Sequence, residues 1–291
     1  MGELNDLEKP KPRSDNLERK FELSTNPESK KIREKLEKEY DRRMSIFGNV
    51  LTVLEIPKES IILAPPVLDR TDFGYTSDID FVFLGTDEER NKLYQRLHAS
   101  FEILPFIVHI DQKRLAEIEN ELPEFYQFLM QRKGNVPSKD VETEIPIVNF
   151  YDEAPELETK ARTVLSQEEK SLLKEQRLKI GDNFVNEVRQ KVPVLGHTFS
   201  GSMMFDTERF GVNSDLDIDL LIDPGDERAE KNVRDWIHVY LKWKYAEEFG
   251  IKVDVGDVSL ESAHMMAVYD PRFAAYYIRE FGIDVSREIE R

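Results

Sequence analysis

Apolar residues recur along the chain with two different periods, and the alternation of these periods predicts a mixed α/β protein. From Pro27 onward an apolar residue stands at every fourth position, which is typical of one face of a helix. These residues are Ile32, Leu36, Tyr40 and Met44, followed by Phe47. Further along, the pattern predicts strands over residues 60–67, 78–84 and 102–111 and helices over 86–100 and 112–132.

The second half of the chain predicts the same order of elements. A helix begins at Ser166, where Glu169 completes a capping box. Leu173, Ile180, Phe184 and Val188 form its apolar face. The pattern then predicts strands over 194–199, 215–222 and 251–258, a helix over 226–249 between the last two, and two short helices around Pro271.

Composition shifts along the chain divide it into four parts. Residues 1–27 are polar and charged with little to bury, so we expect a flexible arm. Residues 134–165 combine prolines with a cluster of acids and are the best linker candidate. The expected domains are therefore 28–133 and 166–291, each an αβ unit with a small mixed sheet flanked by helices.

An internal repeat relates the two domains. When the second half is moved back until Asp206 falls on Asp69, five further identities appear without a gap, which is far more than chance gives. Phe210, Gly211, Ser214, Asp215 and Asp217 fall on Phe73, Gly74, Ser77, Asp78 and Asp80. We interpret this as a duplication in which each copy is built around an Asp-x-Asp strand.

Composition and charge narrow the classes of protein. The chain has 291 residues. It contains no cysteine, which excludes disulfides and cysteine-bound zinc. Its formal net charge of −17 disfavours a long nucleic-acid substrate. No apolar run approaches the roughly 20 residues of a membrane helix, and the N-terminus has no signal-peptide pattern. We expect a cytoplasmic protein without membrane attachment.

The candidate chemistry lies on the strand over residues 215–222. Asp215, Asp217 and Asp219 alternate there with apolar residues, so the three carboxylates share one face of the strand. Stacked carboxylates are unfavourable unless a cation neutralises them. Two such groups can bridge a pair of Mg²⁺ or Mn²⁺ ions, whose preferred ligands are hard oxygens.

Two further features fit the same chemistry. Asp254 stands in an apolar strand with its neighbours pointing the other way, so it can complete the acidic site. Gly201 and Ser202 follow the strand over 194–199. A glycine lets the backbone approach a phosphate closely, and the serine offers an N–H and a hydroxyl.

This ordered set resembles the DNA polymerase β-like nucleotidyltransferase superfamily, whose pattern is Gly-Ser, a spacer, Asp-x-Asp and a later Asp. The resemblance covers about a quarter of the chain. It implies that Gly201 and Ser202 hold the β and γ phosphates of an NTP, and that Asp215, Asp217 and Asp254 bind Mg²⁺ or Mn²⁺. The implied reaction transfers an NMP to a hydroxyl and releases pyrophosphate, the acceptor being a protein side chain, a small molecule or an RNA 3′ end.

Two alternatives concern which acids act. The spacer is longer than in minimal family members, and Asp219 is unusual for the family, so a second register would use Asp217 and Asp219. The repeat favours Asp215 and Asp217 instead, because Phe81 occupies the position equivalent to Asp219. The first half keeps Asp78, Asp80 and a third acid, Asp111, but has Ala64 and Pro65 in place of the Gly-Ser pair. Two interpretations follow: a second active site that holds phosphate in another way, or a degenerate copy that serves as a scaffold. We favour the scaffold.

Two other functions remain open from the sequence. One is a noncatalytic, antitoxin-like binding protein that keeps the nucleotidyltransferase fold and holds a protein partner through the N-terminal helix. The other is a calcium-stabilised structural protein. Ser202 together with all three acids favours the enzyme, because a scaffold has no need of them.

Overall fold

Two compact units make up the protein in the computed structural model, which describes residues 27–64, 79–100, 106–136, 165–205, 210–211 and 214–286. The N-terminal unit comprises Phe21–Arg162 and the C-terminal unit Thr163–Arg291 with Met1–Lys20. Their boundary falls inside the segment predicted as a linker, of which residues 137–164 lie outside the described part, as do 1–26 of the predicted arm. Within the described part, none of the helices combines the length and hydrophobicity needed to cross a bilayer.

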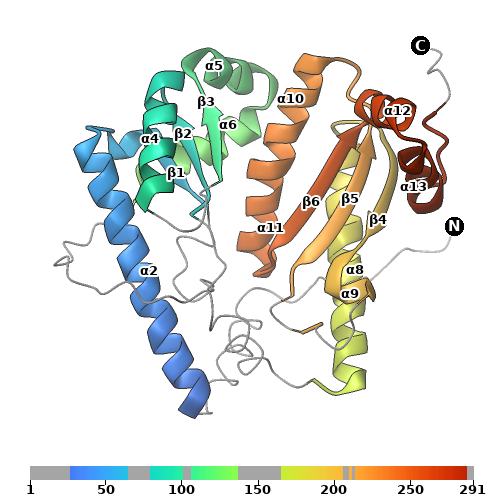
Figure 1. Cartoon of the computed structure of the whole chain (residues 1–291), viewed down its shortest axis with the longest axis horizontal. Helices are drawn as coiled ribbons and strands as arrows, with labels where there is room; N and C mark the ends of the chain where they lie inside the picture. Colours follow the sequence, from blue (N-terminus) through green and yellow to red (C-terminus); the bar gives the residue numbers. More distant parts are fainter. Residues whose placement is uncertain are drawn as a thin grey trace, which may run out of the picture. The chain divides into compact units, whose positions relative to one another are not determined.

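The N-terminal unit contains one three-stranded sheet and five helical segments among its described residues (Figure 1). Strand β2 lies in the middle, antiparallel to β1 and parallel to β3. In chain order the elements are α2 (Pro27–Val53), η2 (Lys58–Ser60), β1 (Ile61–Leu63), β2 (Phe81–Leu84), α4 (Asp87–Ser100), β3 (Ile107–Ile110), α5 (Gln112–Glu121) and α6 (Pro123–Arg132).

The C-terminal unit has a three-stranded sheet of the same design. Strand β5 lies in the middle, antiparallel to β4 and parallel to β6. The elements are α8 (Gln167–Arg189), β4 (Val194–Phe199), α9 (Gly201–Phe205), β5 (Leu216–Ile222), α10 (Glu227–Asp235), the π-helical turn η3 (Trp236–Leu241), α11 (Lys242–Phe249), β6 (Val253–Ser259), α12 (Leu260–Tyr269) and α13 (Pro271–Phe281).

The prediction of two αβ units with small mixed sheets is therefore confirmed, and the shared topology supports the duplication. In both units a long helix precedes an antiparallel strand pair, and a helical crossover leads to a parallel third strand. Two helices then follow, the second of which begins at a proline, Pro123 or Pro271. Most repeat positions of the first copy, Asp69 to Asp78, lie outside the described residues.

Local sequence signals set several helix boundaries. Ser166 and Glu169 form the predicted capping box, and Thr86 and Glu89 form a second one at α4. The helix predicted over 112–132 is instead two helices, because Pro123 lacks the N–H needed to continue the first one. The helix predicted over 226–249 is continuous but contains the π-helical turn in its middle.

The apolar stripe of α2 packs within the N-terminal unit where its side chains are described. Tyr40, Met44 and Phe47 are buried, and the Phe47 ring meets Phe81 of β2 edge to face with centroids 5.1 Å apart. The side chains of Ile32 and Leu36 lie outside the described set. The described part of this stripe thus stabilises its own domain. It gives no support to the alternative in which α2 holds a protein partner.

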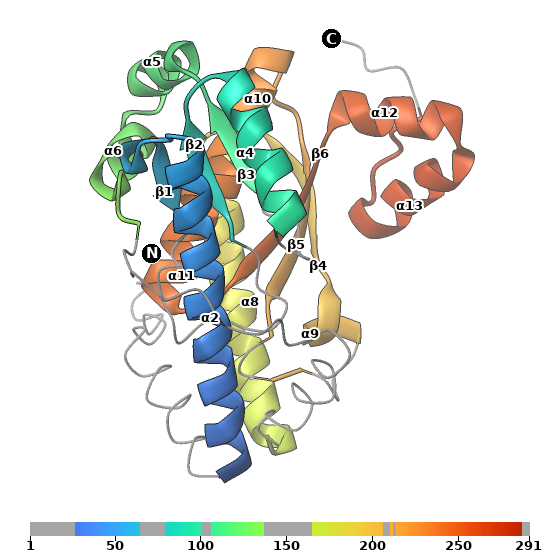
Figure 2. The same cartoon turned by 60° about the vertical axis from the view of Figure 1, so that its left-hand side comes forward.

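The two faces of the C-terminal sheet differ in chemistry. We call one the helix-covered face: Leu216, Ile218 and Leu220 of β5 are buried on it, and Phe199 of β4 packs against Gly181 of α8. The opposite face, the acidic face, carries Asp217 and Asp219. Figure 2 shows α8 and α11 on one side of β4–β6 and α12 and α13 on the other.

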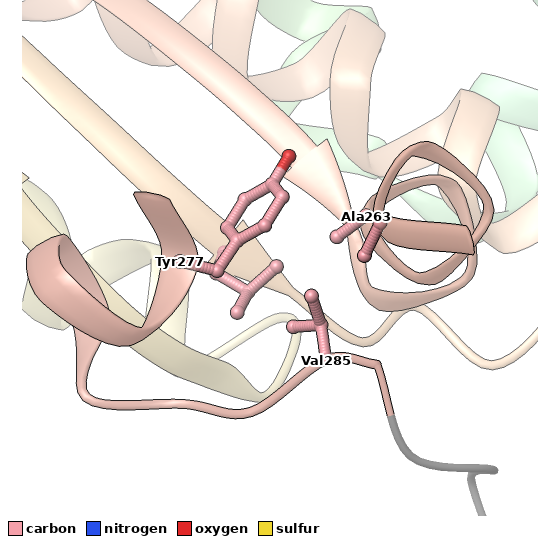
Figure 3. Packing of buried hydrophobic residues seen from close by; sticks show 5 residues of the cluster. Ala263, Tyr277 and Val285 are labelled. Carbon is pink, nitrogen blue, oxygen red and sulfur yellow. The ribbon is translucent and has the colours of Figure 1, made fainter. Parts of the chain in front are cut away.

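Helices α12 and α13 cover only one end of the acidic face. Leu221 of β5 joins a small core there with Ala263, Ala267, Tyr277 and Val285. Figure 3 shows Ala263, Tyr277 and Val285 converging from α12, α13 and the segment that follows. Since strand residues alternate faces, Leu221 is on the same face as Asp217 and Asp219, farther along β5. The acidic end of this face is left clear of the core cluster.

A partly buried cluster around Asp257 ties the helix over the sheet to β6. Asp257 is almost fully buried and accepts a 2.9 Å hydrogen bond from Arg234 Nε, while His238 Nε2 contacts its other oxygen. Burial by itself would raise the pKa of Asp257, but hydrogen bonding and charge from His238 and Arg234 bring it below its usual range. The native state therefore favours the ionised carboxylate.

We expect Asp257→Asn to lower the free energy of unfolding at pH 7 by about 1–3 kcal/mol, the usual contribution of hydrogen bonds to a charged group. An acid whose pKa is lowered by folding stabilises the protein above its unfolded pKa, and this contribution is lost as pH falls through the folded pKa. The difference should therefore shrink below about pH 4. Urea unfolding at neutral and acidic pH checks this, with the exposed Asp254→Asn as a control that should change stability by less than about 0.5 kcal/mol.

Candidate functional site

Asp217 and Asp254 lie side by side on neighbouring strands. In the parallel register of β5 and β6, Asp217 pairs with Asp254, and both stand near the start of their strands. Asp215 directly precedes β5 and follows Ser214, which exchanges two hydrogen bonds with Gly211. The sheet thus brings the three predicted acids to one end of the acidic face.

Gly201 lies directly against the Asp217 carboxylate. The antiparallel pairing of β4 and β5 brings the end of β4 to this point, where Ser200 N–H donates to the Asp217 carbonyl oxygen at 3.1 Å. Gly201 then turns with φ +68°, and a β-carbon built on it would be 1.7 Å from Asp217 Oδ2. Glycine is required here both by the backbone conformation and by the space. Ser202 follows, half-buried, in the first turn of α9.

Lysines pair with the two outer carboxylates. Lys252 Nζ is 3.3 Å from Asp215 Oδ2, and Lys242 Nζ is 3.4 Å from Asp254 Oδ1. A third cation, Arg177 of α8, is buried: desolvation lowers its pKa to about 10, and the Asp215 charge opposes this shift. Basic groups therefore surround the acids on more than one side.

The electrostatics of Asp217 are unfavourable for its ionised form. Burial raises the pKa of Asp217, and the charges of Asp215, Asp254 and Asp219 raise it further, while Lys252 acts in the opposite direction. Like charges near one another favour binding of a cation or a proton. Asp217 is thus the group of the three whose charge most needs neutralisation.

Asp219 has different surroundings from Asp217. Its neighbour on β6 is Gly256, where an added β-carbon would be 2.5 Å from Asp219 Oδ1. Burial raises the pKa of Asp219, a hydrogen bond from Ser200 lowers it, and Glu280 and Asp254 raise it. Because a glycine faces Asp219 whereas a carboxylate faces Asp217, the register favours the acid set Asp215, Asp217 and Asp254.

Within the described residues, no three acidic or histidine side chains are already gathered closely enough to hold a metal ion. The donor set itself suits a hard divalent cation, since it consists of carboxylates with an excess of negative charge. The site residues fit such an ion in chemistry. Their side chains would have to draw together to bind it.

At the position of Asp254 the first copy has no carboxylate, and the prediction that Asp111 supplies the third acid is wrong. Asp80 is the repeat equivalent of Asp217, and the register of β2 and β3 places Phe106 beside Asp80, where β6 has Asp254. Asp111 follows the opposite end of β3, more than about 10 Å away along the strands. Its carboxylate instead accepts a 2.6 Å hydrogen bond from Arg114 N–H and caps α5.

Asp111→Ala is accordingly expected to lower the free energy of unfolding by about 1 kcal/mol, the usual contribution of an N-cap. Because Asp111 is a cap, the substitution should leave nucleotide binding and metal binding unchanged. Thermal unfolding and a Mn²⁺ titration of the same preparation check both parts. A loss of metal binding would restore Asp111 as a ligand.

In the first copy, the position equivalent to Gly201 lies one residue later in the structure than the ungapped sequence alignment places it. Ala64 N–H donates to the Asp80 carbonyl at 2.9 Å, as Ser200 does to Asp217, so Ala64 matches Ser200 rather than Gly201. The next residue in the sequence is Pro65, which lies outside the described part. A proline has φ near −65° and no N–H, so it cannot reproduce Gly201.

The residues that sequence reasoning missed are mainly basic. Arg234 and Lys242 are absent from the predicted site, yet both contact acids of β6. Their spacing with His238, four residues at each step, was the available signal. Arg177 gave no signal, because nothing in the sequence places α8 near Asp215.

Comparisons with protein-family models, curated proteins and solved structures find no significant match to this chain. The functional inference therefore depends on the site's own chemistry.

Proposed function

We propose that the C-terminal unit is a metal-dependent nucleotidyltransferase that transfers an NMP from an NTP to a hydroxyl acceptor and releases pyrophosphate. One observation carries this proposal: the β4 turn at Gly201 lies against the Asp217 carboxylate, which itself lies beside Asp254. The glycine at which the backbone can approach a phosphate and the two carboxylates thereby lie at the same end of the sheet. The resemblance to the polymerase β-like superfamily assigns the same roles to these residues.

Asp215, Asp217 and Asp254 would hold Mg²⁺ or Mn²⁺. Burial and the negative charges of Asp215 and Asp254 raise the pKa of Asp217, so a divalent ion there would relieve repulsion that the protein otherwise carries. When bound, such an ion supplies charge neutralisation and activation of the acceptor hydroxyl.

Gly201 and Ser202 would orient the triphosphate. The missing side chain at Gly201 lets the backbone come close to an anionic ligand, and the Ser202 hydroxyl can donate to a phosphate oxygen. In the transfer, a bond forms between the acceptor oxygen and the α-phosphorus while the bond from that phosphorus to pyrophosphate breaks. Holding the two reactants in line is the main contribution of such a site.

We assign catalysis to the C-terminal unit because of the same residues. The N-terminal unit has Phe106 at the position of Asp254 and Pro65 after Ala64, so it lacks both a third carboxylate at that position and a glycine turn. We propose that it serves as a scaffold. The acceptor is a protein side chain, a small molecule or an RNA 3′ end, and the net charge of −17 disfavours RNA.

Incubation with each of the four α-labelled NTPs and Mg²⁺ or Mn²⁺ tests the proposal, with label followed into protein, RNA and small molecules. Transfer of label to one acceptor class, with release of pyrophosphate, is the expected result. Nucleotide binding without transfer to any acceptor would instead support the noncatalytic binding protein. Absence of both binding and transfer contradicts the proposal outright.

A further inference from the structure

Lys242 reaches the third carboxylate from the other side of the sheet. Its helix packs on the helix-covered face, whereas Asp254 lies on the acidic face, yet the two side chains are 3.4 Å apart. Strand β6 is at the edge of its sheet, so a long side chain can pass around it. Lys242 is only 22% exposed whereas Asp254 is 60% exposed, so the lysine is the more restricted partner of this pair.

The π-helical turn η3 aligns this lysine with β6. Arg234, His238 and Lys242 are four residues apart, and all three contact acids of β6. In a regular α-helix of about 3.6 residues per turn, residues at this spacing drift around the helix. A π-helical turn contains more residues, and so keeps the three on one line. The Asp257 cluster fixes that line against the strand.

Lys252 makes the matching contact on the other outer acid. It is the residue before β6, beside Asp215 in the strand register, and its ammonium is 3.3 Å from Asp215. Its side chain is 58% exposed, against 22% for that of Lys242. Each outer carboxylate of the acidic site therefore already has a cation next to it.

Binding of a divalent ion requires these carboxylates to change partners. The acids of the described part are not gathered around one point, and two of the three site acids contact lysines. A carboxylate oxygen that ligates a metal gives up most of its interaction with an ammonium. Metal ion and lysine are thus alternatives for the same oxygens.

We propose that Lys242 and Lys252 are internal counterions that compete with a divalent metal ion for Asp254 and Asp215, so that metal binding releases both ammonium groups. This inference rests on the proposed function, because it assigns these carboxylates to the metal. The lysines lower the affinity for metal and keep the carboxylates from repelling one another. Lys242 is the stronger competitor, because it is less exposed and held by the anchored helix.

Titration of the full chain with Mn²⁺, followed by electron paramagnetic resonance, tests the competition. Lys242→Met should bind Mn²⁺ about two- to fivefold more tightly than the wild type, the range expected for loss of one partly exposed ion pair. Lys252→Met should show a smaller gain. Lys242→Arg keeps the charge and should match the wild type.

Lys244→Met is the matched control. It removes the same charge from the same helix, but Lys244 pairs with Glu187 at 2.7 Å, outside the acidic set. Its Mn²⁺ affinity should equal that of the wild type. Circular dichroism of each variant confirms that it is folded, and Lys242→Gln replaces Lys242→Met if the latter is not.

The outcomes separate the two proposals. Mn²⁺ affinity that is unchanged or weaker in Lys242→Met overturns the competition but leaves the nucleotidyltransferase proposal standing. Equal gains in Lys242→Met and Lys244→Met also overturn it, since the effect would then be one of net charge. If Asp217→Asn binds Mn²⁺ as well as the wild type does, or if the wild type binds none, the proposed metal site itself is wrong.

Discussion

Asp217→Asn is expected to abolish nucleotidyl transfer, with a loss of about 10³-fold or more. The carboxylate that faces Asp254 is the central one of the proposed metal ligands, and removing it takes away an oxygen ligand and one negative charge. Asparagine keeps the shape of the side chain beside Gly201, so the change tests charge rather than packing. The measurement is label transfer from the preferred α-labelled NTP.

Neighbouring substitutions distinguish the two registers of the acidic strand. Both registers use Asp217, but only one uses Asp215 and only the other uses Asp219. Since Asp219 faces Gly256 across the strands, we expect Asp215→Asn to be as damaging as Asp217→Asn and Asp219→Asn to retain transfer within about tenfold. The reverse pattern would move the site by one step along β5.

Stability should change in the opposite direction to activity. Folding raises the pKa of Asp217, so its ionised form opposes folding, and any favourable contribution of this group is lost as pH rises through the folded pKa. At pH 7 without divalent metal, Asp217→Asn should therefore unfold at the same urea concentration as the wild type or a higher one. A marked loss of stability would indicate that Asp217 is structural.

The second large effect is expected for Gly201→Ala, with a loss of transfer of about 10²-fold. The added β-carbon would stand 1.7 Å from Asp217 Oδ2, so the carboxylate must move, and a displacement of about 1 Å at a reacting centre can have this consequence. The positive φ adds roughly 1–2 kcal/mol of backbone strain. Transfer rate and urea unfolding, measured together, separate the two effects.

Gly225→Ala supplies the control for strain alone. Gly225 also has a positive φ, +88°, but an added β-carbon there would have no neighbour within 4 Å among the described atoms. It should lose stability by a similar amount and keep its activity. If both variants lose transfer equally, strain is the cause and the contact between Gly201 and Asp217 has no catalytic meaning.

The two αβ units differ most where chemistry would occur. Their scaffolds even share an acid–imidazole contact at equivalent strand positions, with the roles exchanged. In the C-terminal unit Asp257 of β6 meets His238, and in the N-terminal unit His109 of β3 lies 3.3 Å from Asp87. The strand registers make Asp257 and His109 equivalent. The two units thus share the packing of sheet on helix and differ at the acidic end.

The sequence by itself determined the order of elements and the face of β5 that carries the acids of the proposed site. These follow from local rules: apolar periodicity separates strands from helices, and alternation along β5 puts Asp217 on the face opposite Leu216 and Ile218. The capping boxes at Ser166 and Thr86 are equally local. The helix break at Pro123 also has a local cause in the sequence, although we expected one helix there.

Only the tertiary structure decided which groups meet. Strand register, which depends on pairing between distant segments, put Asp254 beside Asp217 and put Phe106 where Asp111 was expected to act. It also placed Gly201 against Asp217 and brought Lys242 around the sheet edge to Asp254. Periodicity fixes the face on which a side chain lies, whereas its neighbour on that face is set by packing between elements far apart in the chain.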